Sequence, residues 1–179
     1  AAENQTAIGT VTATDVDTDN SAITFTLSGS ELSITSAGVL TFASAPDYET
    51  KTSYKATVTA TDGTNSTTQS ITVTVTNLND NSPVFTSSAS FSAAENQTAI
   101  GTVTAADGDA SDAVTFTLSG SELSITSAGV LTFASAPDYE TKTSYTATVT
   151  ATDGTNSATQ SITVTVTNLN DNSPVFTSS

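Results

Sequence analysis

The sequence contains no cysteine, methionine, tryptophan or histidine, and these absences exclude several classes of protein. Without those residues the chain cannot form a disulfide, a thiolate metal site, a haem ligand or a Cys–His catalytic pair. The chain also has no run approaching the ~18 to 20 consecutive apolar residues that a membrane-spanning helix needs. We therefore expect no membrane insertion by this chain.

Positive charge is equally scarce. Three Lys are the only basic side chains, against 18 Asp and Glu, which gives a formal net charge of −15 over 179 residues. Such a surface has no basic patch to release counterions from phosphate, so we expect no nucleic-acid partner. An acidic chain that folds compactly must either disperse its carboxylates or neutralise them with cations. The positions of the acids distinguish these two solutions.

The chain is an internal repeat. Residues 1–11 recur as residues 93–103, and the segment that begins at Phe25 recurs almost unchanged from Phe116. Residues 82–88 open the second copy and return as residues 173–179. We therefore predict repeat 1 at residues 1–81, lacking its opening strand, repeat 2 at residues 82–172, and the start of a third repeat at residues 173–179. Cut repeats of this kind imply a longer parent protein.

Within each copy the hydrophobic period is two, which indicates half-buried β-strands. Apolar residues alternate with Thr or Lys over residues 54–61 and 71–76, and Gly, Pro, Asn and Asp turn signals separate the segments. The remaining predicted strands cover residues 7–13, 23–27, 32–34, 39–42 and, in the second copy, 84–92. Seven short strands in each repeat predict an all-β chain of two tandem immunoglobulin-like, Greek-key sandwiches.

Most of the acids recur in five short motifs. Each copy has a Glu-Asn near its start, an Asp-x-Asp, an Asp-Tyr-Glu, an Ala-Thr-Asp-Gly and a closing Asn-Leu-Asn-Asp-Asn-Ser-Pro-Val-Phe. Five motifs in one order, repeated at one spacing, resemble the cadherin repeat over the whole chain. In that family these groups meet between consecutive domains and bind three calcium ions. The resemblance therefore implies a cadherin-type sandwich pair joined by a short calcium-binding linker.

The resemblance also assigns metal ligands residue by residue. In the family, Glu-Asn, Asp-x-Glu and the linker come from the leading domain, and Asp-x-Asp and Ala-x-Asp come from the trailing one. Asn77 departs from the pattern, because the family has Asp there. The implied ligands of the internal junction are Glu3, Asp47, Glu49, Asn77, Leu78, Asn79, Asp80, Asn81, Asp107, Asp109 and Asp153. The implied partial sites at the two ends comprise Asp15, Asp17, Asp62, Glu95, Asp138, Glu140, Asn170 and Asp171.

The residue types favour calcium independently of the resemblance. Calcium takes 6 to 8 oxygen ligands in flexible geometry, whereas zinc prefers His and Cys. The implied junction holds seven carboxylates, and about three Ca²⁺ per complete junction would bring −7 close to neutrality. Without metal, so many like charges would push the repeats apart.

Other interpretations stay open at this point. Asp and Asn are common turn formers, and a lone Asp-x-Asp is usually a solvated turn. A ligand-binding module on the same sandwich is the alternative function, taking either a glycan or an ice surface. The ice interpretation is based on the Thr rows at residues 57, 59 and 61 and at residues 72, 74 and 76.

Catalysis is not expected. Asp47 and Glu49 could be imagined as a glycosidase pair, but they lie two residues apart beside a linker with no aromatic platform. No His, Arg or Cys is available as a base, clamp or nucleophile.

The sequence as a whole predicts a calcium-dependent structural and adhesive repeat of an extracellular cell-surface protein, with calcium making the junction rigid. Its expected partners are the neighbouring repeats and either a cell-surface molecule or a second copy. Near-identical copies without Cys are typical of a bacterial surface adhesin.

Overall fold

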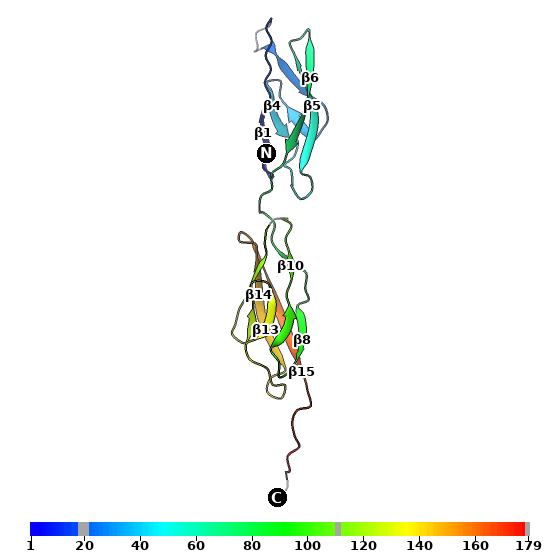
Figure 1. Cartoon of the computed structure of the whole chain (residues 1–179). Coiled ribbons are helices and arrows are strands. Elements are labelled where there is room, and N and C mark those ends of the chain that lie inside the picture. Colours follow the sequence, from blue (N-terminus) through cyan, green and yellow to red (C-terminus); the bar gives the residue numbers. More distant parts are fainter. Residues whose placement is uncertain (18–21, 110–111, 178–179) are drawn as a thin grey trace. The chain divides into compact units, whose positions relative to one another are not determined.

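The computed structural model describes residues 1–17, 22–109 and 112–177. The chain divides into two compact units, Ala1–Leu78 (unit 1) and Asn79–Ser179 (unit 2). Both are all-β sandwiches, which confirms the predicted fold class (Figure 1). The repeat boundaries after residues 81 and 172 stay predictions, and residues 178 and 179 of the predicted third repeat lie outside the described part.

Unit 1 is built from two three-stranded sheets. One has the order β1-β4-β3 and the other the order β2-β5-β6, and all pairs are antiparallel. The strands are β1 (Ala7–Thr10), β2 (Thr24–Leu27), β3 (Leu32–Ile34), β4 (Val39–Phe42), β5 (Ser53–Thr61) and β6 (Ser66–Thr74).

Unit 2 repeats this arrangement and adds its opening strands. Its sheets have the orders β12-β13-β9 and β11-β14-β15-β8, together with the pair β10-β7. The strands are β7 (Val84–Phe85), β8 (Ser90–Ala94), β9 (Ala99–Thr102), β10 (Ala105–Ala106), β11 (Thr115–Leu118), β12 (Leu123–Ile125), β13 (Val130–Phe133), β14 (Ser144–Thr152) and β15 (Ser157–Thr167).

The alternating residues of these strands form the core of each unit. In β15 the buried residues Ile162, Val164 and Val166 alternate with exposed Ser and Thr, as a strand with one wet face requires. Phe133 and Tyr145 add an edge-to-face ring pair at 5.0 Å, and unit 1 has the same pair at Phe42 and Tyr54. Both sandwiches therefore bury one inner face from each sheet.

The opening segment of unit 2 differs from the single predicted strand at residues 84–92. It forms two strands, because β7 pairs antiparallel with β10 and β8 pairs parallel with β15. In unit 1 the described residues hold only a remnant of β8, a parallel bridge between Ala2 and Thr76.

The strand register shows how the predicted Thr rows lie on the adjacent strands β5 and β6. In the β5–β6 hairpin Thr57 lies opposite Ser70 and Thr59 opposite Thr68, whereas Thr72 lies opposite Lys55. The two rows are therefore displaced along the hairpin and do not form one continuous Thr grid. Nothing in this register favours an ice-binding face.

Within the described residues, no helical segment combines the length and hydrophobicity needed to cross a lipid bilayer.

Candidate functional site

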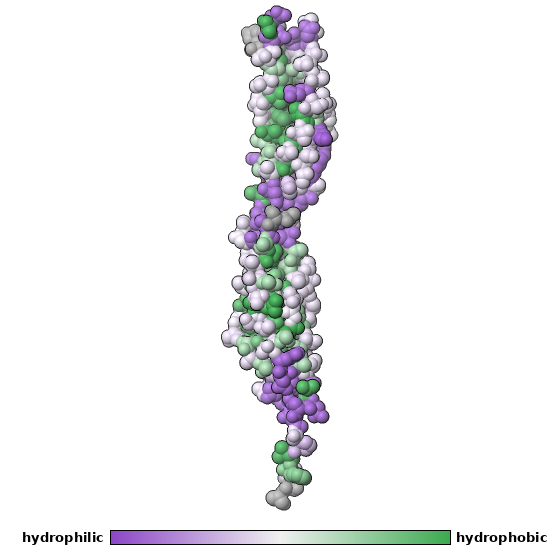
Figure 2. Space-filling model, viewed as in Figure 1, coloured by the Kyte–Doolittle hydropathy of each residue, from purple (hydrophilic) through white to green (hydrophobic). Residues whose placement is uncertain are grey.

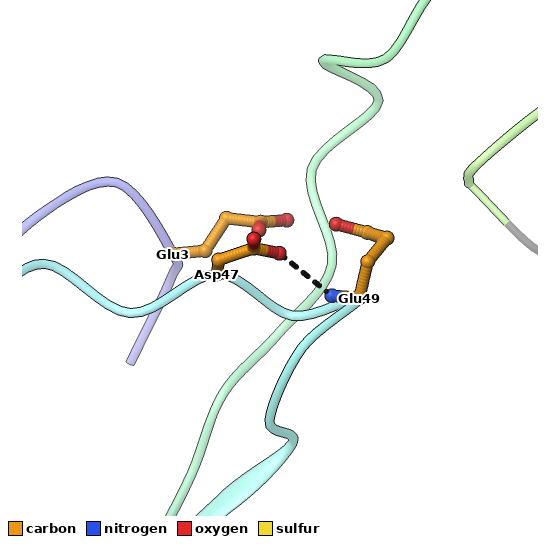
Figure 3. A group of neighbouring side chains, drawn as sticks. All are labelled: Glu3, Asp47 and Glu49. Atoms are coloured by element: carbon orange, nitrogen blue, oxygen red, sulfur yellow. Dashed lines mark hydrogen bonds between the residues drawn. The ribbon is translucent and has the colours of Figure 1, made fainter.

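Three carboxylates gather at one end of unit 1. Glu3, Asp47 and Glu49 each place one oxygen so that the three oxygens lie within 4.8 Å of one another. Figure 3 shows the three side chains pointing toward the same space, with Glu3 coming from the N-terminal segment and the other two from one loop. Converging like charges are the arrangement expected of a cation site.

Glu3 is held rigidly although it is charged. Its side chain is 3% exposed, and its two carboxylate oxygens accept hydrogen bonds from the backbone N–H groups of Leu78 and Tyr48, both at 2.7 Å. The next residue, Asn4, has a φ of 60°, a left-handed conformation that Asn tolerates better than most residues. This turn directs Glu3 inward and ties the end of unit 1 to the Asp47 loop.

Asp47 closes its own turn. Its Oδ1 accepts the backbone N–H of Glu49 at 3.0 Å, and its Oδ2 accepts the hydroxyl of Thr50 at 2.8 Å. The Thr50 hydroxyl, with the turn's backbone N–H groups, lowers the pKa of Asp47 below its usual value. The carboxylate is thereby kept ionised and oriented.

Unit 2 repeats the same cluster with Glu95, Asp138 and Glu140, whose oxygens again lie within 4.8 Å of one another. Glu95 is 3% exposed and accepts the backbone N–H groups of Leu169 at 2.7 Å and Tyr139 at 2.8 Å. Figure 2 shows hydrophilic residues gathered where the C-terminal segment leaves unit 2.

Two Asn side chains extend this second cluster. The Asn168 amide donates to Glu140, and the Asn96 amide donates to Asp171. Asp171, a predicted partial ligand, therefore lies beside the Glu-Asn motif. Asn170 is exposed, and it forms no hydrogen bond within the part of the chain that the structure describes.

The Asp-x-Asp motif of unit 2 holds the first residues of that unit. Asp109 is 1% exposed, and its Oδ2 accepts the backbone N–H groups of Asp80 at 3.2 Å and Asn81 at 2.9 Å. Its own N–H donates to Asp107 at 2.9 Å. A carboxylate that accepts backbone N–H groups fixes the path of the linker segment.

Three oxygens of this region are buried without a hydrogen-bond partner. They are one carboxylate oxygen each of Asp107, Asp109 and Asp153. Burial acts to raise the pKa of Asp153, but the backbone N–H groups of Asn156 and Thr155 outweigh it and lower the pKa. Buried carboxylate oxygens without donors are costly unless a cation compensates them.

Asn77 shows the same property in unit 1. Its side-chain oxygen is buried and has no hydrogen-bond partner, so it presents an oxygen atom suited to a metal ion. Asn79, by contrast, accepts the amide of Asn156 at 2.8 Å through the oxygen that was predicted to bind metal. Asn156 was missed by the sequence interpretation, although its place in the repeated Asp-Gly-Thr-Asn turn was a signal for it.

In the corresponding motifs of unit 1, Asp17 is more exposed than its counterpart Asp109. Asp15 accepts the backbone N–H of Asp17 at 2.8 Å, but Asp17 is exposed, unlike Asp109. Asp62 accepts the backbone N–H groups of Asn65 and Thr64, which lower its pKa below the usual value. Unit 1 therefore keeps the hydrogen-bonded turns of both motifs, but it does not bury Asp17 as unit 2 buries Asp109.

The atoms that could bind a metal ion at these places are all oxygens, since the chain has no His or Cys to supply a nitrogen or sulfur ligand. Carboxylate and amide oxygens suit hard cations such as Ca²⁺, and the buried oxygens without donors fit a bound cation. The residues present are therefore compatible with the calcium sites implied by the motifs.

Comparison with known proteins shows that the chain is similar to cadherins. Residues 1–76 match the family model described as "Cadherin domain". The chain is 36% identical over 121 residues to human "Cadherin EGF LAG seven-pass G-type receptor 1", covering 62% of this chain and 4% of the receptor. It is 34% identical over 186 residues to human "Protocadherin Fat 4", covering 94% of this chain and 4% of that protein. The chain thus spans about 4% of the length of these curated relatives.

Solved structures agree with this match. The crystal structure of mouse Cadherin-23 EC22-24 has a TM-score of 0.78 at 25% identity, with 96% of this chain and 63% of that chain covered. The protocadherin gammaB7 EC3-6 structure has a TM-score of 0.72 at 31% identity, with 83% and 42% covered. Drosophila N-cadherin EC1-4, at 22% identity and a TM-score of 0.75 over 94% of this chain and 46% of that one, shows the fold alone.

Proposed function

Because the chain consists of tandem cadherin-like repeats, we propose that it is a calcium-binding adhesive segment of an extracellular cell-surface protein. In this proposal the Ca²⁺ ions bind where one repeat follows the next and make the linker rigid. Neighbouring repeats are then its first partners, and a cell-surface molecule or a second copy is the adhesive partner. No catalytic role is included.

The observation that carries the calcium proposal is the set of buried oxygens without hydrogen-bond donors. Asp107, Asp109 and Asp153 each contribute one such oxygen, and all three belong to motifs that the family resemblance assigns to calcium. A turn-forming Asp uses its oxygens for backbone N–H groups and leaves the rest to water. When burial excludes water from a carboxylate oxygen and no hydrogen-bond donor replaces it, a bound cation is the better explanation.

The clusters Glu3–Asp47–Glu49 and Glu95–Asp138–Glu140 support the same conclusion. In each, the Glu is already anchored by two backbone N–H groups, so its carboxylate loses little freedom when a metal binds. Preorganised oxygens that keep lone pairs free bind Ca²⁺ better than mobile ones. We propose that repeat 1 supplies the first cluster and repeat 2 the Asp107, Asp109 and Asp153 ligands to one junction.

Isothermal titration of the 179-residue chain with CaCl₂ tests this proposal. We expect about three ions for the complete junction, with dissociation constants on the order of 10⁻⁵ to 10⁻³ M, and weaker partial binding at the two ends. Mg²⁺ should bind much more weakly, because it demands a small octahedral site. A folded sample that releases no heat with millimolar Ca²⁺ would contradict the proposal.

The rigid linker needs its own measurement. NMR relaxation reports how the two units tumble, and we expect their correlation times to converge with Ca²⁺ and to diverge after chelation. If the difference between the two correlation times is the same with Ca²⁺ and with chelator, calcium does not make the linker rigid, even if it binds.

A further inference from the structure

The two copies of the Asp-x-Asp motif differ in their middle residue. Val16 lies between the two Asp of repeat 1, whereas Gly108 lies between Asp107 and Asp109 of repeat 2. Both of these flanking Asp belong to the proposed calcium ligands. The physical reason for a glycine between them therefore bears on how the ligands are held.

The backbone conformation does not require a glycine at position 108. Gly120, Gly129 and Gly154 of the same unit have φ values of 97°, 86° and 100°, in the left-handed region that favours glycine. Gly108 has no positive φ, so a residue with a side chain can adopt its backbone conformation without strain. The reason for this glycine lies in its surroundings.

A linker residue occupies the space that a side chain at position 108 would need. A Cβ atom on Gly108 would lie 2.9 Å from Cγ of Asn81 and 3.2 Å from both its Cβ and its Nδ2. Gly108 is otherwise exposed, so Asn81 is the neighbour that limits its size. Rotation of the Asn81 side chain moves Cγ and Nδ2 but not Cβ, which the backbone fixes. A larger residue at position 108 therefore shifts the backbone at one of the two positions.

The place of Asn81 matters because its backbone covers Asp109. The Oδ2 atom of Asp109 accepts the N–H of Asn81 at 2.9 Å and the N–H of Asp80 at 3.2 Å, and Asp109 is only 1% exposed. Two residues after Asn81, the fully buried Pro83 fixes the continuation of the segment. A shift at Asn81 would lengthen the hydrogen bonds to Asp109 and admit water to its carboxylate.

The same packing leaves oxygens ready for a cation. One carboxylate oxygen of Asp107 and one of Asp109 are buried without a hydrogen-bond partner. Water admitted to these oxygens would compete with a cation, and a looser linker would lose more conformational freedom when the cation binds. A residue that does not touch the metal can thus change its affinity through the groups that orient the ligands.

We propose that Gly108 sets the Ca²⁺ affinity of its Asp-x-Asp motif by letting Asn81 pack closely enough to cover Asp109. This inference rests on the proposed function, because it concerns the same calcium ligands. Gly108 is a positioning residue, since it acts through Asn81 and supplies no side-chain ligand. The middle residue of the motif thereby becomes a place where otherwise similar repeats differ in calcium affinity.

The first test replaces Gly108 in the whole chain and measures the linker without metal. Gly108→Val introduces the residue that repeat 1 has at this position. In chelator, amide hydrogen exchange at Asn81 should become about tenfold faster or more, because its N–H no longer reaches Asp109. The N–H of Val103, which donates to the carbonyl of Gly129 at 2.9 Å, is the internal reference and should keep its wild-type rate.

Calorimetric titration of the same proteins with CaCl₂ measures the affinity. Gly108→Val should weaken binding at this motif about ten- to a hundredfold, the range typical of groups that orient metal ligands. Ala106→Val is the matched control, because it enlarges an exposed residue of β10 two positions earlier and should titrate like the wild type.

A double-mutant cycle tests whether the effect passes through Asn81. Asn81→Ala removes Cγ and Nδ2 but keeps the backbone N–H and carbonyl of the linker. Gly108→Ala should weaken Ca²⁺ binding in the wild-type chain and weaken it clearly less in the Asn81→Ala chain, because the 2.9 Å contact is then absent.

Three results would overturn this role of Gly108: wild-type exchange at Asn81 in the Gly108→Val chain, an unchanged Ca²⁺ affinity of that chain, or additive losses in the double-mutant cycle. If the wild-type chain itself binds no Ca²⁺, the proposed function fails and the affinity role fails with it. Exchange at Asn81 in chelator still measures the positioning role in that case, so the two failures are distinguishable.

Discussion

Asp109→Asn is the most informative single change at the proposed calcium site. The substitution keeps the size of the side chain and one oxygen that can accept the N–H groups of Asp80 and Asn81. It removes the negative charge and replaces the buried oxygen that has no donor. The matched control is Asp17→Asn, which changes the same motif position of unit 1, where the Asp is exposed.

The expected change in unfolding free energy differs between the metal-free site and the site with bound Ca²⁺. Without metal, Asp109→Asn weakens two charge-assisted hydrogen bonds but relieves a buried charge, so the net change should stay within about 1 kcal/mol. With free Ca²⁺ at about a hundred times the dissociation constant, one ion stabilises the fold by about 2.7 kcal/mol. A hundredfold loss of affinity leaves about 0.4 kcal/mol of that stabilisation. The loss of about 2.3 kcal/mol corresponds to about 9 to 18 °C in melting temperature for a domain of this size.

Thermal melts followed by circular dichroism over a series of Ca²⁺ concentrations measure this difference. Wild type and Asp17→Asn should gain stability along similar curves, and Asp109→Asn should need about a hundredfold more Ca²⁺ for the same gain. Melts in chelator provide the metal-free baseline for all three proteins.

Two outcomes would refute the reasoning. If Asp17→Asn and Asp109→Asn shift the curve equally, the effect of calcium is a screening of net charge and not ligation at a defined site. If Asp109→Asn lowers the melting temperature by the same amount with and without Ca²⁺, the carboxylate is a structural anchor of the linker and not a metal ligand.

Two further predictions concern the fold itself. Gly129 has a φ of +86°, and a Cβ there would lie 2.2 Å from the carbonyl oxygen of Val103, so Gly129→Ala should cost about 3 kcal/mol or more in unfolding free energy. Gly154→Ala, at a φ of +100° with open space, should cost only about 1 to 2 kcal/mol, and equal denaturant midpoints would contradict this. Thr141→Val removes the hydroxyl that lowers the pKa of Asp138, a stabilisation present above the usual pKa of 3.8 and lost as pH falls through the folded-state pKa. The variant should therefore lose less stability than the wild type on acidification in chelator, and parallel pH profiles would contradict this.

The alternation of apolar residues predicted much of the strand pattern. Residues 32–34 and 39–42 were predicted with their observed bounds, because each is a short apolar segment between clear turn signals. The first half of β6, Ser66–Ser70, was not predicted, since Ser-Thr-Thr-Gln-Ser has no hydrophobic period. It is a strand because its backbone completes the hairpin with β5.

Strand ends depended on partners that the local sequence does not show. The strand predicted at residues 71–76 stops at Thr74 in unit 1, while the same sequence in unit 2 continues to Thr167. In unit 2 the last residues of β15 pair with β8, and among the described residues of unit 1 only the bridge at Ala2 corresponds to that pairing. Identical residues therefore adopt a strand or a coil according to what lies beside them.

In the candidate site, too, identical residues differ according to what lies beside them. Motif spacing predicted Asp109 as a ligand of the internal junction and Asp17 as part of a partial site at one end, because the two copies share the Asp-x-Asp pattern. Their environments differ, since Asp109 accepts the N–H groups of Asp80 and Asn81 and is buried, and Asp17 is exposed. A motif fixes which atoms can bind a cation, but the preceding linker residues decide whether those atoms are removed from water. Calcium affinity should therefore be a property of an Asp-x-Asp together with the linker that covers it, and identical motifs in one chain should bind the ion unequally.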